Sequence, residues 1–132
     1  MRLTKAQRAT LQQKYGGHCA YCGVVLGEKF HADHLESVQR ELLSKQTAAG
    51  WKLVSGKPLR PQNDVLENMM PACPPCNISK GAQSLEGWWR WISGHINSLN
   101  SYHPIYRLTK VFGLVVETGN PVVFYFERIE KC

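Results

Sequence analysis

The sequence predicts an α+β fold that is held together by a bound metal ion. Two Cys-x-x-Cys pairs lie 50 residues apart. These pairs are Cys19 with Cys22 and Cys73 with Cys76. Short apolar segments near the pairs have the length of strands, whereas residues 85–99 repeat apolar side chains at the spacing of a helix. With 132 residues, the chain is expected to form one domain over 1–132, whose modest core a metal site would stabilise.

The charge of the chain points to a polyanionic partner. The formal net charge is +6 and the isoelectric point is near 9.2, although many basic proteins bind no nucleic acid. No apolar run approaches the roughly 20 residues that span a bilayer, and the first eight residues lack the apolar core of a secretory signal. We therefore expect no membrane partner and a cytoplasmic location.

The N-terminal segment carries the signals of a helix start and stop. Thr4 followed by Gln7 matches a capping box, in which each side chain bonds the backbone of the other. A helix from about Lys5 to Tyr15 follows, and Gly16 with Gly17 is expected to end it.

The two cysteine pairs predict a structural zinc site. In a reducing compartment, paired Cys-x-x-Cys motifs indicate a metal more often than disulfides. Four thiolates fill the tetrahedral shell of Zn²⁺ and leave no open position, so this zinc should stabilise the fold rather than catalyse. Gly23 permits the positive φ of the turn after the first pair. The fifth cysteine, Cys132, has no partner at a useful spacing and is treated as incidental.

Polar residues cluster at the end of a predicted strand. Val24 to His34 is expected to hold a short strand that ends in His-Ala-Asp-His. Strand twist would let Asp33 and His34 reach one cavity, although alternate residues point to opposite faces. A second strand is expected over Val65–Met70, and a helix is expected to open at Asn77.

The segment between these strands is a basic insertion. Glu36 to Ala49 has the composition of a helix, and Trp51 to Arg60 is expected to hold a short extended piece. The cations of the insertion are Arg40, Lys45, Lys52, Lys57 and Arg60. A basic insertion beside a candidate site suits contact with the DNA backbone. The other interpretation is a loop that is only solvated.

The C-terminal half is predicted to be helical before a final strand. An apolar stripe at helical spacing is expected to be buried. It consists of Leu85, Trp88, Ile92, Ile96 and Leu99. Another helix is expected from Ile105, ending near 113–118, and Val122 to Ile129 reads as a strand. In an alternative interpretation, Val111 to Glu117 is also a strand, and it forms a hairpin with the final strand.

Three polar residues have the chemistry that phosphodiester hydrolysis requires. A histidine can take the proton of water near neutral pH, and a carboxylate with an amide oxygen can hold a hard cation. His34, Asp33 and Asn77 supply these groups. Each residue type is common by itself, and their placement relative to the cysteine pairs is what indicates a shared site.

The ordered motifs resemble the HNH endonuclease family, the zinc-bearing branch of the ββα-metal nucleases. The resemblance covers Cys19 to Gly81: Cys-x-x-Cys-Gly, then Asp-His, then Asn, then Cys-x-x-Cys-Asn-x-x-Lys-Gly. It implies a ββα-metal (HNH) core over about 16–100 that is stapled by the four-cysteine zinc site. An N-terminal helix would precede this core, and a C-terminal helix/strand extension would follow over 101–132.

The resemblance also implies roles for single residues. His34 would be the general base, and Asp33 with Asn77 would hold a catalytic Mg²⁺ or Mn²⁺. Asn68 would brace the loop between the strands, and Lys80 would face phosphate. His31 is open between a third metal ligand, an orienter of the base and a core histidine. The gap between His34 and Asn68 is longer than in a minimal module of this family.

The predicted function is metal-dependent endonucleolytic cleavage of DNA, with double-stranded DNA as the expected partner. One active site cuts one strand, so a double-strand cut would need a homodimer or two encounters. Two alternatives remain open: a zinc-stapled module that binds nucleic acid without cutting it, and a nuclease directed at RNA.

Overall fold

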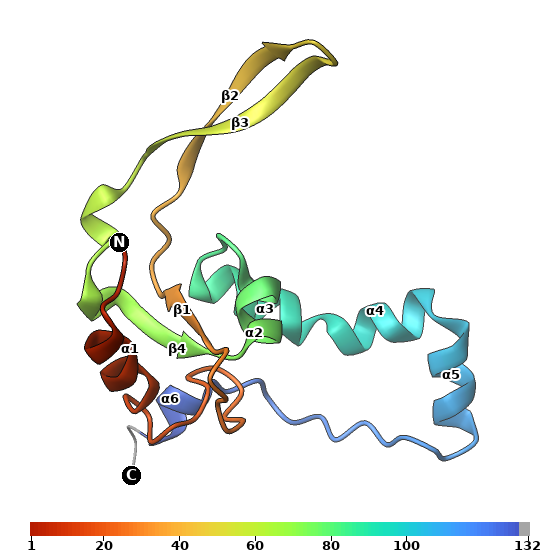
Figure 1. The fold of residues 1–132 in the computed structure, drawn as a ribbon. Coiled ribbons are helices and arrows are strands. Elements are labelled where there is room, and N and C mark those ends of the chain that lie inside the picture. The colour runs from red at the N-terminus through yellow and green to blue at the C-terminus, as the bar shows by residue number, and fades with distance from the viewer. Residues whose placement is uncertain (130–132) are drawn as a thin grey trace. The chain divides into compact units, whose positions relative to one another are not determined.

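The chain is α+β and contains a four-cysteine cluster, as predicted (Figure 1). The computed structural model describes residues 1–129, so Cys132 lies outside the described residues. The elements are α1 (Lys5–Gln12), β1 (His31–His34), β2 (Arg40–Thr47), β3 (Gly50–Pro58), β4 (Met69–Ala72), α2 (Pro74–Lys80), α3 (Leu85–Ser93), α4 (His95–Tyr102), α5 (Pro104–Val111) and α6 (Tyr125–Ile129). Within residues 1–129, no helix combines the length and apolar character needed to cross a membrane.

The chain divides into two compact units. The first contains Met1–Ser84 together with the segment from Phe124 onward, and the second is Leu85–Val123. A compact unit is not the same as an independently folding domain, so the single domain stays a prediction.

The predicted N-terminal helix is confirmed. The Gln7 amide N–H donates to Thr4 Oγ1 over 3.1 Å, and the Thr4 amide N–H donates to Gln7 Oε1 over 3.0 Å. This capping box satisfies backbone donors that the first turn would otherwise leave open. The helix ends at Gln12, three residues before the predicted end. Beyond it, Lys14 Nζ donates to the carbonyl of Met69 over 2.9 Å, which fastens the segment to β4.

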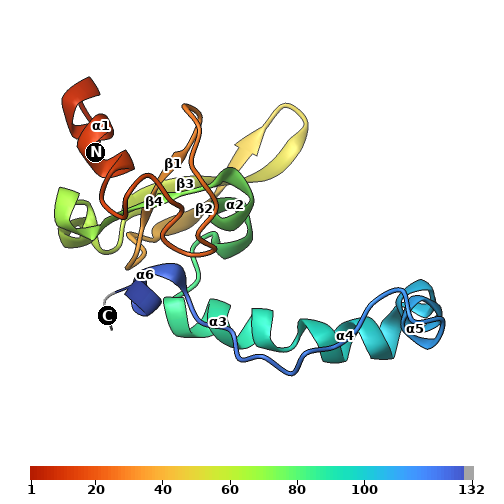
Figure 2. The ribbon, with the colours of Figure 1, turned by 90° about the horizontal axis from the view of Figure 1, so that it is seen from below.

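Strands β1 and β4 form an antiparallel pair in the first unit (Figure 2). All four residues of β4 are buried, whereas Asp33 is the one buried residue of β1. His31 pairs with Ala72 and His34 pairs with Met69. The second strand begins later than predicted, because Leu66–Asn68 forms a 3-10 turn first. The predicted helix start at Asn77 is wrong. Helix α2 begins at Pro74, because a proline in the first turn has a φ already suited to a helix and needs no amide donor there.

The basic insertion forms a hairpin, so the predicted helix over Glu36–Ala49 is wrong. Strands β2 and β3 pair antiparallel, with Lys45 opposite Lys52 and Thr47 opposite Gly50. Cross-strand hydrogen bonds overrode the helical composition of the first strand. The predicted extended piece after Trp51 is confirmed as part of β3.

The second unit is helical, as predicted, but its first helix is divided. Gly94 separates α3 from α4 within the predicted apolar stripe. Trp88 is buried, whereas Ile96 is 46% exposed, so only part of the stripe lies in a core. The helix predicted after Ile105 is confirmed as α5.

The predicted final strand over Val122–Ile129 is wrong. The amide N–H groups of Tyr125 and Phe126 donate to the carbonyls of Tyr21 and Ala20 over 3.0 and 2.8 Å. Tyr125 and Phe126 are already the first two residues of α6, and the amides of Glu127 and Arg128 bond back to the carbonyl of Phe124, which makes the segment helical. An apolar run of this length fits a strand or a packed turn equally well, and packing against the first cysteine loop decides it here.

Candidate metal centre and active site

The four cysteines of the two pairs form one cluster. Their sulfur atoms all lie within 4.8 Å of one another, and Cys22 Sγ is 3.7 Å from Cys73 Sγ. A tetrahedron with zinc–sulfur bonds of about 2.3 Å has edges of about 3.8 Å. The cluster therefore fits a structural metal such as zinc.

Local backbone geometry aims the sulfurs at one point. Gly23 has a φ of +83°, a conformation that side chains rarely adopt. Its amide N–H donates to the carbonyl of Cys19 over 3.0 Å, which closes the first turn. The Cys73 amide N–H donates to Cys19 Sγ over 3.3 Å, so the two pairs are already joined.

The thiols of Cys19 and Cys76 shift the pKa values of each other in opposite directions. A hydrogen bond from the Cys76 thiol lowers the pKa of Cys19 to about 4. The same bond, together with burial, raises the pKa of Cys76. Since metals bind the thiolate form, Cys19 is ready to bind one, and the ion would displace the proton that Cys76 holds.

Asp33 is held in place by side chains from two other parts of the chain. It is only 6% exposed. Tyr21 Oη donates to its Oδ2 over 2.5 Å, and Lys80 Nζ lies 3.1 Å from the same oxygen. Burial and the neighbouring carboxylate raise the pKa of Tyr21, which keeps the phenol as a donor. These two contacts fix the orientation of the carboxylate.

Lys80 has a different place from the predicted one. Its side chain is fully buried, and Nζ also donates to the carbonyl of His34 over 2.8 Å. No exposed atom of this side chain remains to face a phosphate. Its ammonium group instead joins α2 to β1 and balances the charge of Asp33.

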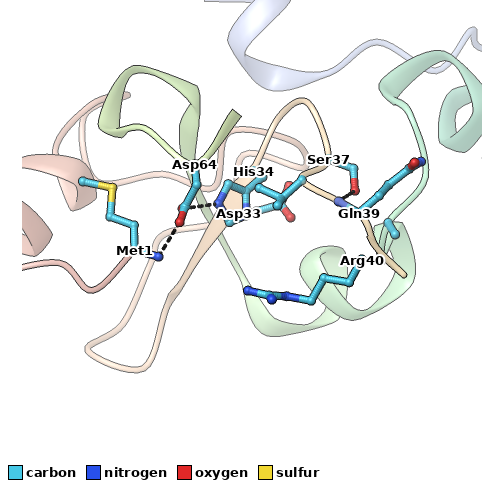
Figure 3. A pocket seen from close by; sticks show the side chains of 10 residues that line it. Met1, Asp33, His34, Ser37, Gln39, Arg40 and Asp64 are labelled. Atoms are coloured by element: carbon cyan, nitrogen blue, oxygen red, sulfur yellow. Dashed lines mark hydrogen bonds and ion pairs between the residues drawn. The ribbon is translucent and has the colours of Figure 1, made fainter. Parts of the chain in front are cut away.

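Asp33 and His34 line one cavity of about 320 Å³ (Figure 3). His34 Nε2 lies 2.9 Å from Asp64 Oδ1, and the α-amino group of Met1 lies 2.6 Å from Asp64 Oδ2. Hydrogen bonds from Met1 and then from His34 lower the pKa of Asp64. Asp64 is not among the residues that the sequence pattern indicated; its only local signal is a carboxylate just before the segment that leads into β4.

Asn77 lies beside His31 rather than in this cavity. Its Nδ2 is 2.7 Å from His31 Nδ1. His31 and Asp33 share one face of β1 because they are two residues apart in a strand. Asn77 and Lys80 lie about one helical turn apart on α2. Asn77 contacts His31, and Lys80 contacts Asp33.

Asn68 holds the loop that follows β1. Its Nδ2 donates to the carbonyls of Glu36 and Asn63 over 2.8 and 2.6 Å, and its Oδ1 accepts from the Glu36 amide over 2.9 Å. This is the kind of position that the resemblance implies for the middle asparagine. Asn68 is not among the described residues that line the cavity beside His34, and a catalytic role for it stays a prediction.

Asp33 and Asn77 fit a hard cation by the type of their atoms. Both contacts of Asp33 run through Oδ2, and the contact of Asn77 runs through Nδ2. Within residues 1–129, Asp33 Oδ1 and Asn77 Oδ1 therefore carry no hydrogen bond. Carboxylate and amide oxygens suit Mg²⁺, which keeps most of its waters and takes few protein ligands. That the two oxygens share one ion stays a prediction.

The predicted DNA-contact residues of the insertion are exposed. Arg40 lines the cavity of Asp33 and His34. The other four lie along or just after the hairpin: Lys45, Lys52, Lys57 and Arg60. Their contact with DNA stays a prediction.

Known proteins give no further guide to this site. Comparisons of the chain with family models, with curated proteins and with solved structures found no match. The case for a function therefore rests on the geometry and chemistry described above.

Proposed function

We propose that this chain is a metal-dependent DNA endonuclease of the HNH type, acting at the cavity beside β1. The observation that carries the proposal is that Asp33 and His34, neighbours on one strand, line the same cavity. The order β1, β4, α2, with the cysteine cluster joining the loop before β1 to the start of α2, supports a ββα-metal core.

His34 is the proposed general base. When its Nε2 carries the proton that Asp64 accepts, Nδ1 keeps a free lone pair. Nδ1 can then take a proton from water while the water oxygen bonds to phosphorus. The bond from phosphorus to the 3′ oxygen breaks, and solvent protonates that oxygen. The products are 5′-phosphate and 3′-hydroxyl ends.

The remaining polar residues position the site. Asp64 sets the tautomer and the ring orientation of His34, while Tyr21 and Lys80 hold the Asp33 carboxylate. A divalent cation such as Mg²⁺ or Mn²⁺, bound by Asp33 and Asn77, would offset the negative charge of the scissile phosphate.

Cleavage of a supercoiled plasmid tests the proposal. With Mg²⁺ or Mn²⁺ added, the wild-type protein should produce nicked circles, and His34→Ala should be slower by about 10²-fold or more. His103→Ala is the matched control, because His103 is exposed and its side chain makes no described contact. Full activity of His34→Ala, or an uncut plasmid with both metals and wild-type protein, would refute the assignment.

A second candidate is a zinc-stapled domain that binds nucleic acid without cutting it. The ion pair between Lys80 and Asp33 favours it, because the ammonium group already neutralises the carboxylate proposed to bind the catalytic cation. Duplex binding by wild-type protein that leaves the plasmid supercoiled with both metals would select this candidate.

A further inference from the structure

The β2–β3 hairpin is a two-stranded ribbon whose large side chains are exposed. Leu42 is 71% exposed, Trp51 is 72% exposed and Leu53 is 65% exposed. A lone two-stranded hairpin is only marginally stable in water, and contiguous exposed apolar side chains mark contact surfaces. The ribbon therefore has the character of a binding element.

The register of the hairpin gives its two faces different chemistry. Residues paired across the ladder point to the same face, and alternate pairs point to opposite faces. One face carries the pairs Leu42–Ser55, Ser44–Leu53 and Gln46–Trp51, and the other carries Leu43–Val54 and Lys45–Lys52. The first face is apolar and amide-bearing, whereas the second ends in two lysines.

The charge of the ribbon favours a polyanion. Like charges directly opposite each other in a ladder are destabilising, and Lys45 lies opposite Lys52. Between Arg40 and Pro58 four cations stand against the single carboxylate of Glu41, which leaves a net charge of three positive. Bound phosphates would relieve the repulsion between the two lysines.

The ribbon begins at the rim of the candidate active site. Residues Ser37 to Arg40 line the same cavity as His34, and β2 starts at Arg40. Figure 1 shows β2 and β3 continuing as an extension of their own. At about 3.3 Å per residue, a nine-residue strand spans about 30 Å. That length corresponds to about nine base pairs of duplex DNA at 3.4 Å each.

We propose that the β2–β3 ribbon enters the major groove of duplex DNA next to the scissile phosphate. Lys45 and Lys52 contact phosphates of the groove walls, and Gln46 and Trp51 face the base edges. The major groove of B-DNA admits a two-stranded ribbon, whereas that of A-form RNA is too deep and narrow for side chains to read. The position beside the cut rests on the proposed function, but the binding of DNA by the ribbon does not.

A salt titration of binding tests the ribbon directly. The probe is a labelled DNA duplex several helical turns long, with protein carrying His34→Ala so that the duplex stays intact. Adding Lys45→Ala and Lys52→Ala should weaken binding by about 10-fold or more near 0.1 M salt and reduce the slope of log K against log salt by about two. Methyl green, a major-groove ligand, should displace the protein, and netropsin, a minor-groove ligand, should not.

The matched control removes two other exposed lysines of the same unit. Lys5 and Lys29 lie outside the hairpin and make no described side-chain contact, so Lys5→Ala with Lys29→Ala should change affinity and slope less. Equal effects in both pairs would overturn the inference. Absent duplex binding, or equally salt-sensitive binding of double-stranded RNA, would overturn it too.

Plasmid cleavage by proteins that retain His34, measured beside duplex binding, separates this inference from the proposed function. If loss of Lys45 and Lys52 weakens duplex binding but wild-type protein does not cleave the plasmid, the proposed nuclease activity is refuted and the proposed binding of DNA by the ribbon is supported. Cleavage that is lost in His34→Ala but unchanged in a Lys45→Ala, Lys52→Ala protein that retains His34, together with unchanged duplex affinity on loss of the two lysines, would refute the ribbon and keep the nuclease.

Discussion

At the scale of single residues, the site depends on contacts between side chains that are far apart in the sequence. Tyr21 comes from the first cysteine loop and Lys80 from α2, and both contact the same carboxylate oxygen of Asp33 on β1. The Asp-His sequence indicated the proposed catalytic residues, but no local pattern indicated that the side chain of Lys80 would be buried. Burial of a lysine requires a paired anion, and only the packing of α2 on β1 supplies it.

Replacing Asp64 should impair the proposed base without disturbing the fold. Asp64→Asn keeps the shape of the side chain but removes the carboxylate that selects the Nε2–H tautomer of His34. We expect kcat to fall roughly 10- to 100-fold with little change in KM, because in the proposed mechanism Asp64 acts through the ring of His34. Steady-state kinetics on a labelled duplex would measure the effects on kcat and on KM separately.

Asp64→Glu is the companion variant, since a longer carboxylate can still reach the ring and should restore part of kcat. A rise in KM alone, or a lowered melting temperature that accounts for the loss, would argue against a positioning role.

At the scale of elements, the cysteine cluster clamps the first loop to the junction of β4 and α2. Cys19 and Cys22 lie on the turn stabilised by Gly23, and Cys73 and Cys76 flank the start of α2. The helix is only seven residues long. Isolated helices of this length are unstable in water, so its position depends on the clamp and on Lys80.

Removal of one ligand should therefore destabilise the first unit. Cys73→Ser should bind less than one zinc per chain, and its melting temperature should fall by about 10 °C or more, since each kcal/mol shifts it by a few degrees. Metal content and thermal melting would be measured together. Cys132→Ser is the matched control and should keep both values. A Cys73→Ser protein that melts like wild type would contradict the clamp.

At the scale of the whole molecule, the first unit is completed by the C-terminal segment. Phe124 is buried, and its ring lies 5.8 Å from that of Tyr21 in an edge-to-face arrangement. Tyr21 in turn donates to Asp33. The segment lies outside the motifs that indicated function, yet it packs against a residue that orients the site.

Truncation of this ring should have a large effect on stability. Phe124→Ala should destabilise the protein by about 3–5 kcal/mol, as expected when a buried phenylalanine leaves a cavity. Phe112→Ala is the matched control, because Phe112 is 75% exposed, and it should stay within about 0.5 kcal/mol of wild type. Urea unfolding would measure both. Equal effects in the two variants would show that the buried ring does not support the first unit.

Local signals in the sequence were sufficient where the chemistry is local. The capping box at Thr4 and the cysteine spacing predicted a helix start and a metal cluster, because each depends on a few neighbouring residues. The hairpin could not be predicted in this way, since composition favoured a helix over Glu36–Ala49 and pairing with β3 decided otherwise.

The sequence by itself determined the α+β class, the four-cysteine cluster and the Asp33–His34 pair beside it. Only the tertiary structure decided that Lys80 is buried against Asp33, that Asp64 bonds to His34, and that the basic insertion forms a ribbon. Motif spacing specifies which groups can meet, but the direction in which each side chain points depends on the elements packed around it. That packing involves residues too far apart in the chain for a local pattern to record.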